Sequence, residues 1–325
     1  MRIEAFSESR EPSHPAANED AFVIIPGRAY AAIDGVTDRN GTRYDGMLAG
    51  RYAARLIAAK LEAMFTTAAP AAEDVVPALT ATLAAAYRRH GVDPSAAGWG
   101  GRMCCTLALA IIRADVVEVV LVGDSGVRIG GHTVLQMAKD LDRITATLRR
   151  HAWPLIAARV ADQVERERLA RLFVFHGAKH GLPSLLTPPE TATIAAAAEA
   201  DCRTTLPHVP AADVAFLLRE GIVDGQGAFQ NNTDSVLGYA CLDGFAVPRT
   251  LMRVARFDRA DAAMLELFTD GYARPAPGFG VAAWEADFAA TEAEDPSKIS
   301  AYPGVKGSVP GKWSDDRTYL GVVEG

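Results

Sequence analysis

Five short acidic segments, each beside a turn at one end of an apolar run, constrain this chain more than any other feature. The runs at 30–33, 118–122 and 264–269 have the length and composition of buried strands, and an acidic residue follows each of them. Neighbouring core strands deliver their terminal residues to one edge of a sheet, so we expect these carboxylates to converge. The segments are Asn18-Glu19-Asp20, Asp34-Gly35, Gly123-Asp124-Ser125, Thr269-Asp270-Gly271 and Ser314-Asp315-Asp316.

Converged carboxylates repel and desolvate one another, so they require cations. Hard oxygen ligands select Mg²⁺, Mn²⁺ or Ca²⁺ over the softer ions that Cys and His favour. Two such ions, about 3.5–4 Å apart, could bind a phosphate oxygen and activate a bridging water. Taken singly, an Asp-Gly pair is usually a turn, and Gly-Asp-Ser can be a helix cap or an Asx-turn. The joint occurrence of five such segments favours a metal centre.

The remaining pattern predicts an α+β fold in which sheets are sandwiched between outer helices. A hairpin signal at Pro26-Gly27 joins two β-prone runs, and another lies at Gly130-Gly131. Apolar residues recur at helical spacing over 44–65 and 75–87. The predicted strands are 21–25, 30–33, 106–113, 118–122, 127–129, 134–136, 236–241, 264–269 and 319–323, and 285–311 is predicted to be loops.

The middle of the chain has a different composition. Residues 139–173 are rich in Arg, Ala and Leu and predict helix interrupted at Pro154, and 192–202 predicts a second helix. Few acidic residues converge there, so we interpret about 139–235 as a helical insertion in a single domain that spans 1–325.

Charge and cysteine usage limit the class of protein. The net charge of −7 argues against nucleic acid as a partner, because phosphate backbones attract basic surfaces. A charged N-terminal segment and the lack of a long uncharged run predict neither a signal peptide nor a membrane span. The four cysteines have no zinc-ligand spacing, and we expect reduced thiols and a cytoplasmic protein. They are Cys104, Cys105, Cys202 and Cys241.

The ordered acidic segments resemble the motifs of the PPM (PP2C-type) metal-dependent protein phosphatases, as a divergent bacterial-type member. They span residues 18–318, and the small residues Gly46, Gly50 and Ala53 stand where that family packs a helix closely on its sheet. The resemblance implies a four-layer αββα sandwich of two mainly antiparallel sheets, with the insertion at the family's variable flap.

The resemblance also implies roles for single residues. Asp34 would bridge two tightly held Mn²⁺ or Mg²⁺ ions, with the Gly35 carbonyl on one of them. Asp124, with Asp270, would hold a third and weaker ion. Asp20 would orient a metal-bound water, and Asp316 would supply a supporting hydrogen bond. The other ligands of the second of these two tight ions would be Glu19, Asp270 and Asp315.

The chain departs from the family at the phosphate-binding arginine. Pro15 occupies that position, and it offers neither a charge nor an N–H donor. Arg10 and Arg102 are our candidates for binding the substrate phosphate, and His14 is a candidate that could also donate a proton to the leaving group.

These observations predict a phosphatase that hydrolyses phosphate monoesters by attack of a metal-bridging water, with phosphoserine or phosphothreonine in proteins as the substrate. A small phosphorylated metabolite is the alternative substrate. A partner-binding regulatory module with residual activity is the alternative of another class. The oligomeric state is not predicted.

Overall fold

A computed structural model describes residues 1–37, 40–96 and 98–324 of the chain. The chain divides into two compact units. The first comprises Met1–Ala138, Ala240–Ala289 and Asp315–Gly325, and the second comprises Lys139–Tyr239 and Ala290–Ser314. The insertion expected at about 139–235 forms most of the second unit. That the whole chain acts as one domain stays a prediction.

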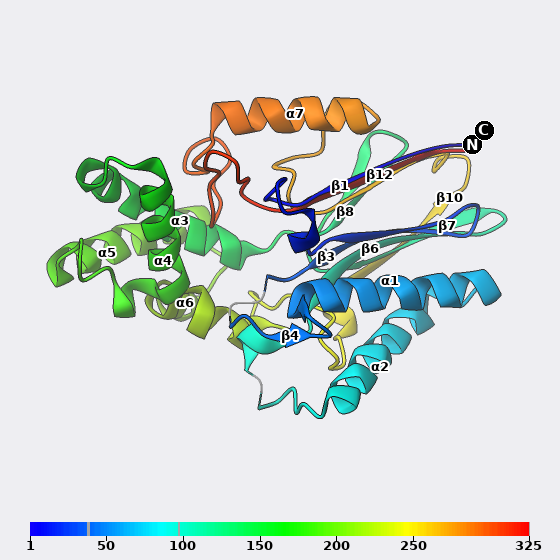
Figure 1. Ribbon diagram of the computed structural model, residues 1–325, viewed down its shortest axis with the longest axis horizontal. Helices are drawn as coiled ribbons and strands as arrows, with labels where there is room; N and C mark the ends of the chain where they lie inside the picture. Colours follow the sequence, from blue (N-terminus) through cyan, green and yellow to red (C-terminus); the bar gives the residue numbers. More distant parts are fainter. Residues whose placement is uncertain (38–39, 97, 325) are drawn as a thin grey trace. The chain divides into compact units, whose positions relative to one another are not determined.

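Two antiparallel five-stranded sheets form the centre of the first unit (Figure 1). The first sheet has the order β1-β12-β11-β8-β9 and the second the order β10-β7-β6-β3-β2. Strands of the first sheet are β1 (Arg2–Glu8), β8 (Gly126–Ile129), β9 (Thr133–Leu135), β11 (Met264–Phe268) and β12 (Arg317–Val323). Strands of the second are β2 (Ala21–Ile25), β3 (Ala29–Gly35), β6 (Cys105–Ile112), β7 (Val116–Val122) and β10 (Met252–Asp258). A short pair, β4 (Arg43–Tyr44) with β5 (Met47–Leu48), precedes the first helix.

Side-chain alternation along β3 explains why its sheet is covered on both faces. Tyr30 and Ala32 pack into the core between the two sheets, whereas Ala31 and Ile33 pack into the core beneath the outer helices. Every residue of β6 is buried, as expected for a central strand with apolar neighbours on both faces. Register pairs Asp34 with Thr106 and Gly35 with Cys105, which fixes the end of β3 beside the start of β6.

Helices cover the outer faces of both sheets. Figure 1 shows α7 (Val281–Glu294, orange) along the first sheet, and α1 (Ala49–Thr67) with α2 (Ala72–His90) along the second (blue and cyan). Trp284 of α7 is fully buried and stacks against Phe268 and Tyr319 of the first sheet. The predicted four-layer αββα sandwich is therefore confirmed.

Several local predictions were wrong. Residues 236–241 form no strand and contribute only an isolated bridge at Tyr239. The start of the supposed loop at 285–311 belongs to α7, whose Trp284 and Phe288, four residues apart, are both buried. Strands β1 and β10 were missed because they are edge strands whose partial burial gives no clean alternation.

The second unit is helical. Its hydrophobic core contains Leu148, Phe173 and Leu217, which come from three different helices. The prediction that Pro154 interrupts its helix was wrong: α3 continues to Arg159, and Ala152 and Ile156 on either side of Pro154 are both buried in the core. The helices are α3 (Asp140–Arg159), α4 (Gln163–His180), α5 (Pro188–Thr205) and α6 (Ala211–Gly225).

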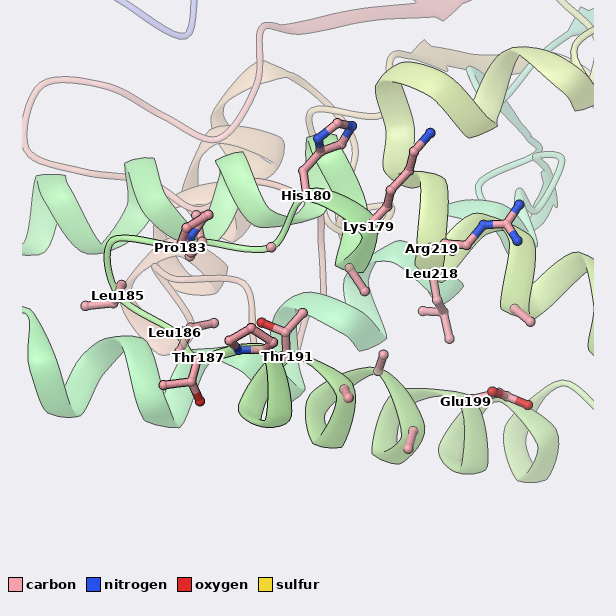
Figure 2. A pocket seen from close by; sticks show the side chains of 18 of the residues that line it. Lys179, His180, Pro183, Leu185, Leu186, Thr187, Thr191, Glu199, Leu218 and Arg219 are labelled. Atoms are coloured by element: carbon pink, nitrogen blue, oxygen red, sulfur yellow. The ribbon is translucent and has the colours of Figure 1, made fainter.

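A cavity of about 790 Å³ lies in this unit, between α5, α6 and the segment that joins α4 to α5. Figure 2 shows Thr191 and Glu199 along one side of it, with Leu218 and Arg219 opposite. Its lining residues all fall within 178–219. Across the described parts of the chain, no helix combines the length and apolar character that a membrane span needs.

Candidate metal centre

Three of the five acidic segments meet in the first unit. Asp34 lies near the end of β3, Asp124 follows β7, and Asp270 follows β11. Each offers a carboxylate oxygen, and these three oxygens lie within 4.8 Å of one another. Because they belong to strands of both sheets, the two-sheet sandwich itself brings them together. Three carboxylates this close repel one another unless a cation or protons compensate.

Asp316, in the fifth acidic segment, forms a hydrogen bond with the backbone of the first. Its Oδ1 accepts the backbone N–H of Arg10 at 2.6 Å, and its Oδ2 accepts that of Glu19 at 2.8 Å. Burial raises the pKa of Asp316, while these two N–H donors lower it and the charge of Asp315 raises it. The N–H of Asp316 in turn donates to Asp315 Oδ1 at 3.2 Å. The segments that contain Glu19 and Asp315 are thereby held together by backbone and carboxylate hydrogen bonds.

Close packing around Gly35 leaves no room for a side chain. A β-carbon there would lie 2.5 Å from the Glu19 carbonyl oxygen and 2.6 Å from that of Gly50. Glu19 is itself only 3% exposed. The backbone of Gly35 therefore stands directly against the Glu19 segment, at the position where the resemblance implies a carbonyl ligand.

Asp20 directly precedes β2 and is 3% exposed. Its Oδ2 accepts a hydrogen bond from the Thr269 hydroxyl at 2.8 Å. Burial raises the pKa of Asp20 well above its ordinary value, and the charges of Asp316 and Asp270 raise it further. Oδ1 is buried and has no hydrogen-bond partner among the residues that the structure describes. A buried carboxylate oxygen of this kind normally faces a cation, a proton or a water. A cavity of about 620 Å³ also borders Asp20.

The three candidate phosphate ligands have different surroundings. Arg10 carries its charge near Asp316, where it lowers the pKa of that carboxyl. The His14 ring is 70% exposed and contacts Ser13 at 3.0 Å and Glu11 at 3.8 Å. Arg102 pairs with the buried carboxylate of Asp243 at 3.1 Å and lies over the Phe245 ring.

No local pattern in the sequence marks Arg51, which follows Gly50 on α1. Its guanidinium donates to the carbonyl oxygen of Asn18, in the first acidic segment. Burial lowers the pKa of Arg51 and the nearby Arg55 adds to this, whereas the carboxylates of Asp316 and Glu19 raise it. Arg51 is therefore a cation beside Glu19 and Asp316 of the acidic segments.

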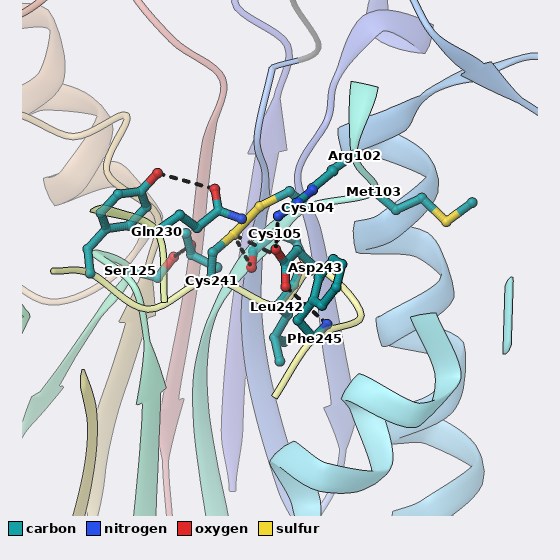
Figure 3. The surroundings of a disulfide bond; sticks show 12 residues. Arg102, Met103, Cys104, Cys105, Ser125, Gln230, Cys241, Leu242, Asp243 and Phe245 are labelled. Carbon is teal, nitrogen blue, oxygen red and sulfur yellow. Dashed lines mark hydrogen bonds and ion pairs between the residues drawn. A yellow bond between two sulfur atoms is a disulfide. The ribbon is translucent and has the colours of Figure 1, made fainter. Parts of the chain in front are cut away.

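A disulfide between Cys104 and Cys241 lies next to β6, with Arg102 and Asp243 beside it (Figure 3). The Cys104 carbonyl accepts the N–H of Val36 at 3.0 Å, so the bridge adjoins the backbone that follows Gly35. The expectation of four reduced thiols was wrong for this pair, whose partners lie 137 residues apart and meet only through the fold. Cys105 and Cys202 are free and buried. The cytoplasmic location loses the support of reduced thiols and stays a prediction.

No protein-family model matches the chain, and no curated protein matches it. Solved structures that resemble it include the serine/threonine phosphatase PstP/Ppp of Mycobacterium tuberculosis, with a TM-score of 0.45 and 15% identity over 100% of this chain and 99% of that one. Stp1 from Staphylococcus aureus has a TM-score of 0.47 and 12% identity, over 100% and 96% of the two chains. The catalytic domain of PstP in complex with two manganese ions has a TM-score of 0.43 and 15% identity, over 98% and 96%.

These structures bear the names of the phosphatase class that the acidic segments resemble.

Proposed function

We propose that this chain is a metal-dependent phosphatase that hydrolyses phosphate monoesters, with phosphoserine or phosphothreonine in proteins as its substrate. One observation carries the proposal: Asp34, Asp124 and Asp270, from three separate motifs, bring carboxylate oxygens within 4.8 Å of one another. Three carboxylates this close repel one another, and a bound cation would relieve that repulsion.

The residues present fit divalent cations. The donors are carboxylates and a backbone carbonyl, which suit Mn²⁺ or Mg²⁺. Asp20 Oδ1, buried and without a hydrogen-bond partner among the described residues, is a further acceptor that a bound water could satisfy. Two tight ions would be held by Glu19, Asp34, Gly35, Asp270 and Asp315, and a third, weaker ion by Asp124 with Asp270. When bound, such ions polarise a phosphate oxygen and lower the pKa of a water.

The chain's own residues would then do three things. Asp20 orients the attacking water through its carboxyl group. Asp316 holds the backbone of Arg10 and Glu19, and thereby fixes the first acidic segment. A nearby cation, Arg10 or Arg51, pairs with the outward oxygens of the phosphate, since charge-assisted hydrogen bonds to phosphate are strong.

Turnover of p-nitrophenyl phosphate with and without Mn²⁺ tests the proposal. We expect hydrolysis that EDTA abolishes and added Mn²⁺ restores, because no other group in the cluster can replace the cation. Undiminished hydrolysis after verified metal removal would contradict a metal mechanism. A protein that binds Mn²⁺ but turns over no phosphate ester would instead be the partner-binding module.

A second comparison separates the two substrate classes. A phosphoserine peptide should be hydrolysed with a higher kcat/KM than sugar phosphates, because the cavity beside Asp20 offers space for the chain that flanks the phosphorylated side chain. The reverse order would favour a small metabolite.

A further inference from the structure

The carboxyl group of Asp20 is held through only one of its two oxygens. Oδ2 accepts the Thr269 hydroxyl at 2.8 Å, whereas Oδ1 has no hydrogen-bond partner within the described part of the chain. The group is 3% exposed, so bulk water does not supply the missing partner freely. The two oxygens of this one carboxyl group therefore differ in what they can do.

The Thr269 hydroxyl donates its single proton to Asp20 Oδ2 and accepts with its lone pairs. Thr269 Oγ1 accepts the backbone N–H of Thr318 at 2.9 Å. The hydroxyl therefore links the backbone of β12 to the Asp20 carboxyl group. The Thr269 N–H also donates to the Thr318 carbonyl at 3.0 Å, so its backbone is held by β12.

We propose that Thr269 is a positioning residue: by donating to Oδ2, it turns Oδ1 of Asp20 toward the reacting water. This inference rests on the proposed phosphatase function. Thr269 itself is fully buried, so it acts through Asp20. Its effect is geometric, because the hydrogen bond from the hydroxyl to Oδ2 sets the rotation of the Asp20 carboxyl group about its side-chain bond. Without this bond, neither oxygen of the carboxyl group would have a preferred direction.

Other side chains around Asp20 hold its backbone. Asn18 Oδ1 accepts the N–H of Asp20 at 2.9 Å, and Asn18 Nδ2 donates to Ser7 Oγ at 2.9 Å. Ser7 Oγ lies 2.8 Å from the Thr318 hydroxyl, which also stabilises the Asp20 carboxylate, though less than Thr269 does. Loss of the Thr269 hydroxyl should therefore leave the main chain in place, while the carboxyl group keeps only the weaker interaction with Thr318 and rotates.

The test compares Thr269→Val, which removes the hydroxyl at nearly constant volume, with Thr269→Ser, which keeps it. Thr145→Val is the matched control, because Thr145 in α3 is equally buried and donates only to the Leu141 and Asp142 carbonyls. We measure kcat and KM for p-nitrophenyl phosphate at saturating Mn²⁺, Mn²⁺ affinity by calorimetry, and the metal-free crystal structures. If Thr269→Val does not fold, Thr269→Ala replaces it.

Thr269→Val should lower kcat by about tenfold or more, with KM and Mn²⁺ affinity changed by roughly twofold or less. Thr269→Ser should retain most of the wild-type kcat. The control, Thr145→Val, should have the same kcat as the wild type. The crystal structure of Thr269→Val should show the Asp20 carboxyl group rotated, and that of Thr269→Ser should not.

Wild-type kcat in Thr269→Val, or an equal loss in Thr269→Ser, would overturn the inference. Weakened Mn²⁺ affinity as the main effect would overturn it too, since Thr269 would then act on the adjacent Asp270. If wild-type protein shows no turnover with Mn²⁺, the proposed function fails as well. If wild-type protein turns over and Thr269→Val is unaffected, this inference alone fails.

Discussion

Gly35 and Gly50 approach each other so closely that neither can carry a side chain. A β-carbon on Gly35 would lie 2.6 Å from the Gly50 carbonyl oxygen. A β-carbon on Gly50 would lie 2.3 Å from the Val36 carbonyl oxygen and 2.9 Å from Glu19 Oε1. The first turn of α1 therefore packs directly on the Asp34-Gly35 turn and on the Glu19 carboxylate.

Gly50→Ala should destabilise the protein and weaken the metal centre. Alanine favours an exposed helix by about 1 kcal/mol over glycine, but here the overpacking should outweigh this and lower the free energy of unfolding by about 1–3 kcal/mol. Mn²⁺ affinity should fall because Glu19 and Gly35 are displaced. Urea denaturation and calorimetry measure the two effects. Gly225→Ala in α6 is the control, since its β-carbon would meet nothing nearer than 3.3 Å.

The central strands and the acidic motifs were predictable because each leaves a local signal. A strand buried on both faces, such as β6, is an unbroken apolar run, and an acidic residue after it marks where the core ends. Period and composition suffice for features of this kind. The close packing of a helix at Gly50 and Ala53 was, in contrast, implied by the family resemblance.

Features that depend on distant contacts left no local signal. The Cys104–Cys241 bridge joins residues 137 positions apart, and their spacing alone does not identify the pair. Arg51 looks like any charged helical residue until the fold brings it to Asn18. In the sequence Thr269 is only the neighbour of Asp270, because the partner of its hydroxyl, Asp20, lies 249 residues away.

Asp34→Asn should be the most damaging single change to activity. Asp34 lies in the close carboxylate group and is the residue proposed to bridge both tight ions. We expect kcat/KM for p-nitrophenyl phosphate to fall by about 10²–10³-fold. Folding should survive, and the metal-free protein should gain about 1 kcal/mol of unfolding free energy, because one repulsive charge is removed. Wild-type turnover at saturating Mn²⁺ would remove Asp34 from the centre.

Asp124→Ala tests whether Asp124 binds the third, weaker ion or one of the two tight ions. If Asp124 belongs to the weaker site, two ions should remain bound in a calorimetric titration while turnover decreases. Its backbone should stay in place, since Gln136 donates to its carbonyl oxygen at 2.9 Å whatever the side chain. Loss of the tightest site instead would show that Asp124 is a ligand of the central pair.

Reduction of the Cys104–Cys241 bridge should lower stability. The bridge closes a loop of 137 residues, and cross-links over long loops stabilise proteins by about 2–5 kcal/mol. Cys104→Ser with Cys241→Ser should therefore lower Tm and abolish any effect of a dithiol reductant. Cys202→Ser is the control, because that thiol is free and buried. An unchanged Tm in the double variant would mean that the bridge contributes nothing to stability.

The last prediction concerns which cation meets the phosphate. Arg102 is engaged with the buried Asp243, so Arg102→Ala should lower the free energy of unfolding by about 3 kcal/mol and leave KM unchanged. Arg10 and Arg51 both act electrostatically on Asp316, beside the acidic cluster. Alanine at either should raise KM for p-nitrophenyl phosphate, or lower kcat/KM, by about tenfold or more, with Mn²⁺ affinity nearly unchanged.

Two further variants make this test selective. Arg51→Lys keeps the charge but loses the planar guanidinium. If Arg51 binds two phosphate oxygens, kcat/KM of Arg51→Lys should lie between those of Arg51→Ala and the wild type. His14→Ala should lower kcat and not raise KM if the exposed imidazole protonates the leaving group. Wild-type kinetics in Arg10→Ala, Arg51→Ala and His14→Ala together would mean that the metal ions alone hold the phosphate. A raised KM in Arg102→Ala, with the free energy of unfolding unchanged, would indicate that Arg102 binds the phosphate. Its ion pair with Asp243 would then have to break when substrate binds.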